Sequence, residues 1–188
     1  TQERRVVLVA PTFRDSRATS LGIDASVAAM LDDWCERQRA EIVFKFHPFE
    51  RGTASVSGRH LHVCDATTDV YPLLPHAHAL VTDYSSIYMD YLLLDRPVCF
   101  FVPDLEDYVR SDRQFQFDFE EMTPGPKART WQRLLSVLEE QWRDDGFKAE
   151  RARLRKLAFD DLDPHDAVPM LIEFMRGKGW IAGARPTA

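Results

Sequence analysis

The chain has 188 residues, of which 45% are hydrophobic, and a formal net charge of −6 at pH 7. This length supports one substantial core, so we expect a single domain spanning residues 1–188 rather than two full α/β domains. The negative balance argues against general nucleic-acid binding, and no apolar run approaches the roughly 18 residues of a membrane span.

The N-terminus and the cysteines say more about the setting of the chain. The first residues, TQERR, contain neither an initiator Met nor the apolar segment of a signal peptide, so we expect a fragment of something larger. Cys35, Cys64 and Cys99 are far apart and match no metal-ligand spacing. We therefore expect reduced thiols in a core or helix, and no zinc.

The first strand is predicted in residues 5–13, where five consecutive apolar residues precede a polar turn. If the strands are parallel, this strand brings Thr12 and Arg14 to the carboxyl edge of the sheet. Arg14 is then a candidate phosphate ligand, although the same position suits a solvated loop arginine.

An amphipathic helix is predicted over residues 25–39, followed by a second strand over residues 41–48 that ends in His47 and Pro48. Proline stops the hydrogen-bond ladder and keeps the preceding histidine extended. His47 is therefore placed to meet a ligand, although lone histidines are more often structural. A third strand over residues 60–65 puts Leu61 and Val63 on one face and a His60/His62 pair on the other, with no third metal ligand nearby.

The fourth strand-to-helix connection is the clearest in the chain. Residues 68–78 predict a helix, and residues 79–81 a buried strand that stops at the elbow Thr82–Ser86 before a helix through Leu94. Free N–H groups at a helix start favour an anion, and Ser85 and Ser86 add hydroxyl donors. The alternative is that Asp83 or Ser85 is simply an N-cap.

After a fifth strand over residues 98–102, residues 105–126 fit no single helix or strand. Such a segment in a compact domain is often functional, and Glu120 and Glu121 could accept hydrogen bonds from ribose hydroxyls. Gly125 belongs to a rigid Thr-Pro-Gly-Pro turn. The alternative is a surface loop anchored by its aromatic residues. Residues 130–143, 148–159 and 166–175 then predict three helices.

The alternation of strand and helix predicts an α/β fold with a doubly wound parallel sheet. No G-x-G-x-x-G follows the first strand, so dinucleotide binding of the dehydrogenase type is not supported.

Five segments in this order resemble the CDP-glycerol glycerophosphotransferase family, whose enzymes polymerise teichoic acid and related capsule backbones. They are APTFRDS at residues 10–16, FHP at 46–48, TDYSSIYMDY at 82–91, DRPVCFF at 95–101 and FDFEEMTPGP at 117–126.

The resemblance implies the C-terminal, donor-binding lobe of a two-lobed GT-B fold, with a Rossmann-like sheet. It also implies transfer of a polyol phosphate from a CDP-alditol to a growing chain, with release of CMP. By the motif match, the donor pyrophosphate lies at Ser85 and Ser86, with Asp83 and Tyr84 in the same elbow, and His47 lies close to the phosphates. The segment containing Glu120, Glu121 and Gly125 contacts cytidine and ribose, with Glu121 the preferred ribose ligand.

Other implications concern the whole enzyme. The family works at the inner face of the cytoplasmic membrane on lipid-linked acceptors, and the general base is expected in the missing lobe. No cofactor is assigned, and a Mg²⁺ requirement stays open. Residues 163–168, DPHDAV, depart from the family's Ser-rich helix start, which leaves the transferred alditol or sugar phosphate open. The alternatives are a nucleotide-sugar glycosyltransferase or epimerase lobe, and a non-catalytic nucleotide-binding module.

Overall fold

The computed structural model describes residues 3–12, 21–47, 56–111, 117–160 and 164–181. Within these residues the strands form one six-stranded sheet in the order β3-β2-β1-β4-β5-β6, with every neighbouring pair parallel. The strands are β1 (Arg5–Val9), β2 (Ala40–Phe44), β3 (Leu61–Val63), β4 (Ala79–Thr82), β5 (Val98–Phe101) and β6 (Lys127–Ala128). The predicted doubly wound parallel sheet is confirmed, and its strand order reverses between β1 and β4.

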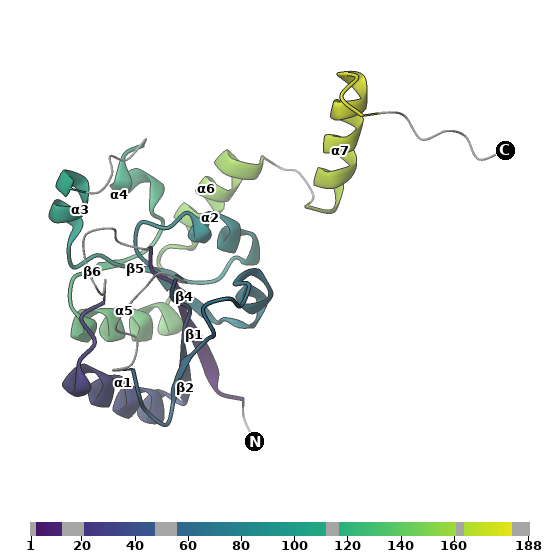
Figure 1. The fold of residues 1–188 in the computed structure, drawn as a ribbon. Coiled ribbons are helices and arrows are strands. Elements are labelled where there is room, and N and C mark those ends of the chain that lie inside the picture. The colour runs from purple at the N-terminus through teal and green to yellow at the C-terminus, as the bar shows by residue number, and fades with distance from the viewer. Residues whose placement is uncertain (1–2, 13–20, 48–55, 112–116, 161–163, 182–188) are drawn as a thin grey trace. The chain divides into compact units, whose positions relative to one another are not determined.

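Helices cover both faces of this sheet. Figure 1 shows α1 and α5 together on one side. The opposite side is covered by η2 and α2. The helical segments are α1 (Ala25–Gln38), η2 (Tyr71–His76), α2 (Ile87–Tyr91), η3 (Leu92–Leu94), α3 (Leu105–Ser111), α4 (Phe119–Met122), α5 (Trp131–Arg143), α6 (Lys148–Phe159) and α7 (Pro164–Gly177).

The two core layers follow from the two-residue period of the strands. In β1, Val7 and Val9 point into the layer under α1 and α5, whereas Leu8 points into the layer under η2 and α2. Because the side chains on both faces of the central strands are buried, the sequences of these strands are nearly continuous apolar runs.

The two long helices on the first face begin at side-chain caps. The Asp24 carboxylate accepts a hydrogen bond from the Val27 amide at 2.8 Å, and the Thr130 hydroxyl accepts one from the Arg133 amide at 3.2 Å. The helix predicted over residues 130–143 is confirmed as α5, which buries Trp131, Leu134, Leu135 and Leu138 on one face.

Several local predictions differ from the structure. The helix predicted over residues 68–78 is the 3-10 helix η2, because Pro72 and Pro75 supply no backbone donors. The third strand, predicted over residues 60–65, is shorter: β3 has only three residues and lies at the sheet edge, where Leu61 is buried but Val63 is 43% exposed. The segment 105–126, predicted as irregular, contains α3 and α4, and the two-residue β6 was not predicted.

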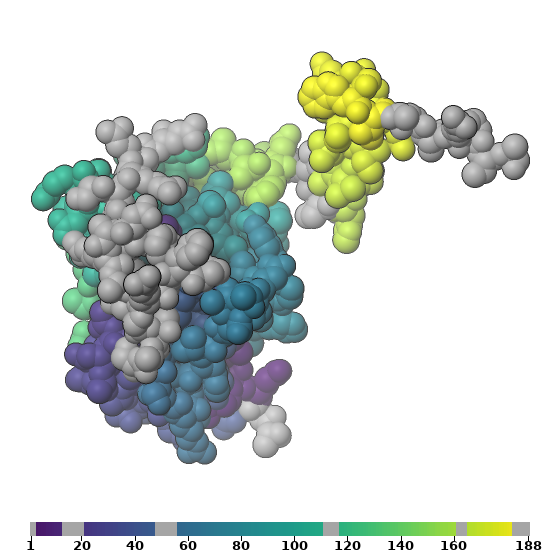
Figure 2. Space-filling view, viewed as in Figure 1, coloured from purple at the N-terminus to yellow at the C-terminus, as the bar shows by residue number. Residues whose placement is uncertain are grey.

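Contact density divides the chain into two compact units, residues 1–155 and 156–188. The second unit contains the last residues of α6 and all of α7, shown in yellow in Figure 2, whose apolar side chains Val168, Leu171 and Phe174 are exposed. None of the described helices is long and apolar enough to cross a bilayer. All three cysteines are free thiols, and burial raises the pKa of Cys35 and of Cys99 to about 12.

Candidate functional site

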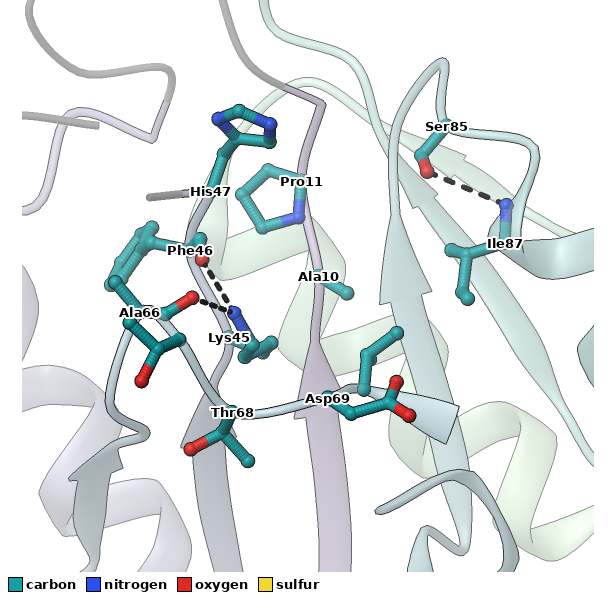
Figure 3. Close-up of a pocket in the computed structure, with 12 residues that line it drawn as sticks. Ala10, Pro11, Lys45, Phe46, His47, Ala66, Thr68, Asp69, Ser85 and Ile87 are labelled. Carbon is teal, nitrogen blue, oxygen red and sulfur yellow. Dashed lines mark hydrogen bonds between the residues drawn. The ribbon is translucent and has the colours of Figure 1, made fainter. Parts of the chain in front are cut away.

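A cavity of about 380 Å³ opens at the carboxyl edge of the sheet. The ends of four adjacent strands contribute to its wall: β1, β2, β3 and β4 each lead into lining residues (Figure 3). It therefore spans the point at which the strand order reverses, which is where doubly wound sheets bind ligands. The lining residues are Ala10, Pro11, Lys45, Phe46, His47, Ala66, Thr67, Thr68, Asp69, Val70, Ser85 and Ile87.

The predicted serine corner lies at this edge. Ser85 lines the cavity, and its hydroxyl accepts a long hydrogen bond of 3.4 Å from the Ile87 amide. Ser86 is the N-cap residue of α2, but its side chain makes no capping bond. Both hydroxyls can therefore donate to a bound anion.

The helix after this corner is shorter than predicted. α2 ends at Tyr91, and the 3-10 helix η3 continues to Leu94 before Asp95 takes a left-handed conformation with φ 48°. A five-residue helix sums few peptide dipoles, so the serine hydroxyls of the corner, rather than a macrodipole, are the groups that can attract an anion.

Asp83 and Thr12 brace the corner from below. The Asp83 side chain is buried, and its Oδ1 accepts hydrogen bonds from the amides of Thr12 at 2.8 Å and of Tyr84 at 2.6 Å. The Thr82 hydroxyl also donates to the Ala10 carbonyl at 2.7 Å. These bonds tie the end of β1 to the end of β4. Direct substrate contacts of Thr12 and Asp83 stay predictions.

His47 and Lys45 approach the cavity from the end of β2. The predicted strand over residues 41–48 ends at Phe44, so His47 lies three residues beyond it; His47 is exposed and lines the cavity, and its contact with a ligand stays a prediction. Lys45, two residues earlier, was not predicted as a site residue, yet it lines the same cavity. Its ammonium donates hydrogen bonds to the carbonyls of Phe46 at 3.0 Å and Ala66 at 2.9 Å. The two-residue spacing, which places both side chains at one strand end, was the signal available in the sequence.

A second cavity, of about 230 Å³, lies on the other side of the serine corner. Aromatic and methionine side chains form most of its wall, and Ser86 and Asp118 supply polar groups. Burial raises the pKa of Tyr88, so its phenol is a neutral donor at pH 7. The aromatic residues that line it are Tyr84, Tyr88, Phe117 and Phe119. Phe117 and Phe119 were not predicted as site residues.

Tyr84, in the wall of this second cavity, packs against the segment that contains α3. Its ring stacks on Tyr108 with centroids 3.9 Å apart, and its hydroxyl donates to Asp104 Oδ1 at 3.0 Å. Tyr84 thus links the corner to α3, a helix in the segment predicted as irregular.

The predicted acidic residues lie on α4, beside this cavity. The Glu120 carboxylate pairs with Lys127 at 3.1 Å, and the Glu121 side chain is exposed. Gly125 is buried in backbone contacts, because an added Cβ would meet the Val98 carbonyl oxygen at 2.0 Å. Arg14 lies outside the described residues. Ligand contacts of these four residues stay predictions.

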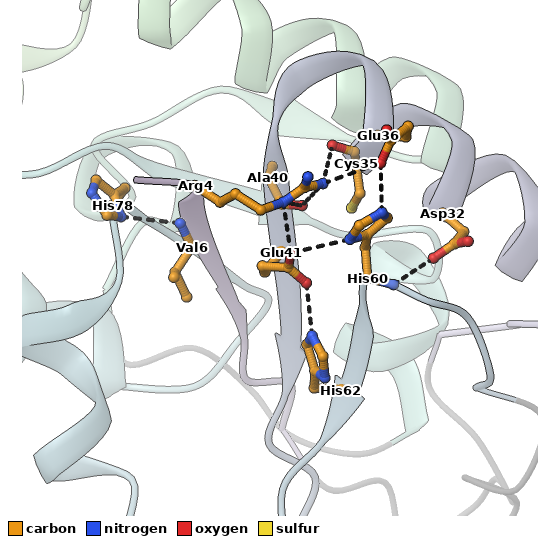
Figure 4. Close-up of polar contacts among 10 residues, drawn as sticks. All are labelled: Arg4, Val6, Asp32, Cys35, Glu36, Ala40, Glu41, His60, His62 and His78. Carbon is orange, nitrogen blue, oxygen red and sulfur yellow. Dashed lines mark hydrogen bonds and ion pairs between the residues drawn. The ribbon is translucent and has the colours of Figure 1, made fainter. Parts of the chain in front are cut away.

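His60, just before β3, and His62, within it, lie beside Glu41 near the start of β2 (Figure 4), and so at the end of the sheet opposite the cavity. His60 Nδ1 is 3.1 Å from Glu41 Oε1, and His62 Nε2 is 2.7 Å from Glu41 Oε2. The same carboxylate contacts Arg4 Nε at 2.6 Å. Among the described residues, no group of three or more His, Cys, Asp or Glu side chains converges as a metal site.

The 3-2-1-4-5-6 strand order and a ligand-sized cavity at its carboxyl edge define a Rossmann-like lobe of the GT-B glycosyltransferase type. The chain belongs to the CDP-Glycerol:Poly(glycerophosphate) glycerophosphotransferase family, whose model matches residues 1–165. The family predicted from the five motifs is therefore confirmed.

Relatives with known names agree with this assignment. The teichoic acid poly(ribitol-phosphate) polymerase of Bacillus spizizenii is 31% identical over 150 residues, covering 74% of this chain and 23% of the relative. The teichoic acid poly(glycerol phosphate) polymerase of Bacillus subtilis is 30% identical over 155 residues, covering 74% of this chain and 19% of the relative.

The fold is similar to that of the wall teichoic acid polymerase TagF, with a TM-score of 0.71 and 22% identity. That match covers 95% of this chain and 44% of the TagF chain. This chain thus spans less than half of the length of each of these three proteins.

Proposed function

We propose that this chain is the donor-binding lobe of a transferase that moves glycerol phosphate, or another polyol phosphate, from a CDP-alditol to a growing teichoic acid or capsule polymer. CMP is the released product. The family and the named relatives support this reaction class. The acceptor, a polymer or lipid-linked chain, would bind to a lobe beyond these residues, and the full protein would work peripherally at the inner face of the cell membrane.

The observation that carries the proposal is the pair of cavities that meet at one corner. Ser85 and His47 line the cavity of about 380 Å³, which we call the polar cavity after its charged and hydroxyl side chains. The adjacent Ser86 lines the cavity of about 230 Å³, which we call the aromatic cavity. A CDP-alditol has a flat base at one end, a polyol at the other and a diphosphate between them. The aromatic cavity suits the base, the polar cavity suits the polyol, and the hydroxyls of the corner suit the diphosphate.

The arrangement supports in-line displacement at phosphorus. An acceptor hydroxyl attacks the phosphorus that carries the polyol, the new P–O bond forms, and the bond to the CMP oxygen breaks with its electron pair moving to CMP. His47 is the described side chain best placed to donate a proton to the departing phosphate or to stabilise its charge. The proton of the acceptor hydroxyl passes to a base on the acceptor lobe.

Calorimetric titration of the chain with CMP, CDP-glycerol, CDP-ribitol and UDP-N-acetylglucosamine tests the proposal. We expect cytidine nucleotides to bind selectively. Ser85→Ala and Ser86→Ala should each lower the affinity for CDP-glycerol by about tenfold, because each removes a hydroxyl that donates to a charged phosphate. Ser136→Ala, on the exposed face of α5, is the matched control and should bind like the wild-type chain.

Two results would redirect the assignment. Preferential binding of the uridine compound would favour a nucleotide-sugar glycosyltransferase or epimerase. Unchanged affinity in both corner variants would remove the diphosphate from Ser85 and Ser86.

A further inference from the structure

Lys45 is a buried cation in the wall of the polar cavity. Lys45 comes directly after the last residue of β2, and it is only 9% exposed. Its ammonium carries three N–H donors, and two of them bond the carbonyls of Phe46 and Ala66. Because these carbonyls belong to the segments after β2 and β3, the ammonium is held in place at the carboxyl edge of the sheet (Figure 3).

Lys45 differs from other shielded cations in having no direct ion pair with an acid among the described residues. Asp65 lies beyond ion-pair distance, and its pKa is lowered mainly by hydrogen bonds from Thr67 and to a smaller extent by the charge of Lys45. Within the described residues, no carboxylate lies within ion-pair distance of its ammonium, and its third N–H has no acceptor. By contrast, buried Arg151 pairs with Asp145 and Asp95, and half-buried Lys127 pairs with Glu120. A buried charge without a directly paired counter-charge is costly, so folds keep one mainly where a ligand supplies the opposite charge at close range.

From this contrast we infer that Lys45 binds the phosphate that is transferred, together with His47 and Ser85, which line the same cavity. The inference rests on the proposed function and assigns one phosphate of the donor to one side chain. An ammonium fixed by two carbonyls neutralises phosphate charge without having to reorganise during the reaction.

Ser85 and Ser86 line different cavities, and this arrangement indicates which of the two donor phosphates lies near Lys45. Lys45 lines the cavity of Ser85, whereas Ser86 lines the aromatic cavity assigned to the base. The phosphate attached to the nucleoside therefore lies toward Ser86, and the phosphate that carries the polyol lies toward Lys45.

Asp69 restricts where the anion can lie in the polar cavity. Its exposed carboxylate also lines the cavity, and its Oδ1 accepts a hydrogen bond from the Tyr71 amide at 3.0 Å. A carboxylate repels phosphate but accepts hydrogen bonds from hydroxyls. The phosphate is thus kept on the Lys45 side, and the polyol hydroxyls face Asp69.

Comparing CMP with CDP-glycerol tests the inference, since CMP lacks the transferred phosphate. Lys45→Met removes the charge but keeps an unbranched side chain. For this variant we expect calorimetry to show an affinity for CDP-glycerol that is lower by about tenfold to a hundredfold, and an affinity for CMP that is lower by less than about twofold. Lys45→Arg should recover part of the CDP-glycerol affinity. Lys148→Met, which removes an exposed lysine on α6, should leave both affinities unchanged.

Equal losses for the two ligands, or no loss for either, would overturn the inference. Retained CMP binding also shows that Lys45→Met is folded.

Side-chain NMR of the wild-type chain keeps the test independent of the variant. The Lys45 ammonium signal should shift with CDP-glycerol and not with CMP, while the Lys148 signal stays in place. Glycerol 3-phosphate, added alone, separates the two proposals. If no cytidine nucleotide binds but glycerol 3-phosphate shifts the Lys45 signal, the proposed function fails and the anion site stands. If neither CDP-glycerol nor glycerol 3-phosphate shifts it, the inference fails.

Discussion

Gly125 shows what a single residue contributes beside the candidate site. The backbone here passes so close to β5 that an added Cβ would lie 2.0 Å from the Val98 carbonyl oxygen and 3.2 Å from the Phe100 ring. The neighbouring Pro126 carbonyl accepts a hydrogen bond from the Phe100 amide at 2.8 Å, so the turn cannot move away without breaking the sheet. The role that the structure shows for Gly125 is close packing against β5.

We therefore predict that Gly125→Ala lowers the free energy of unfolding by about 2–3 kcal/mol, because an overpacked backbone contact must be relieved by a shift of the strand. Urea denaturation measures this change. Gly146→Ala is the matched control, since an added Cβ there meets nothing within 4 Å. Equal unfolding free energies for the two variants would contradict the prediction.

Lys45 and His47 show at the same scale why a sequence motif gives only part of a site. Alternation along an extended segment explains why both side chains reach the same cavity. The pairing of Lys45 with two carbonyls, rather than with an acid, depends on where the segment after β3 passes.

At the scale of the elements, a polar cluster joins α1, β2 and β3 at the end of the sheet opposite the candidate site. Glu41 of β2 lies at its centre and contacts Arg4, His60 and His62, and His60 also approaches Glu36 of α1 at 2.7 Å (Figure 4). Burial raises the pKa of Glu41, but the hydrogen bonds from His62 and His60 and the charge of Arg4 outweigh it, so the pKa is lowered overall from 4.5.

This shift makes the stability of the cluster depend on pH. A carboxyl whose pKa is lower in the folded state stabilises the fold above its unfolded pKa, and this contribution is lost as the pH falls through the folded pKa. We predict that Glu41→Gln costs about 2 kcal/mol of unfolding free energy at pH 7, and that the cost shrinks as the pH falls below 4.5.

Unfolding in urea at a series of pH values measures the difference between wild-type and variant chains. Glu150→Gln, at an exposed position of α6, controls for loss of a charge and should give a small difference at every pH. A cost for Glu41→Gln that stayed constant from pH 7 to pH 3 would show that the carboxylate charge does not stabilise the cluster.

At the scale of the whole molecule, the chain forms two compact units and spans less than half of its named relatives. The residues proposed to contact the nucleobase and the diphosphate, and the proposed proton donor His47, all lie within residues 1–155. The proposed mechanism takes the base for the acceptor hydroxyl from outside this chain.

We accordingly predict that the chain binds CDP-glycerol but releases no CMP from it above the background rate. In a longer protein that carries both lobes, His47→Ala should lower polymer synthesis by about a hundredfold or more, the size expected for loss of proton transfer. Radiolabelled polymer yield measures this effect, with His76→Ala as the exposed-histidine control. Full polymer synthesis by the His47→Ala protein would instead favour a non-catalytic nucleotide-binding module.

The fold class, the order of the main elements and the family could all be predicted from the sequence. Continuous apolar runs mark buried parallel strands. The segments around His47 and Ser85 match motifs of the family in the same order, so short local patterns were enough to predict the fold class and the family. The same patterns missed the sixth strand, because Lys127 and Ala128 form only two residues of ladder and have no periodicity of their own.

Only the tertiary structure decided how these residues combine. The order of the strands brings the ends of β1, β2, β3 and β4 to one cavity, and so joins Lys45, His47 and Ser85, which are up to 40 positions apart in the chain. It also turned Asp83 toward backbone amides and left Lys45 without a carboxylate partner in the described residues. These properties depend on neighbours contributed by other strands, and burial and charge pairing of a side chain are set by all of its neighbours in space rather than by those beside it in sequence.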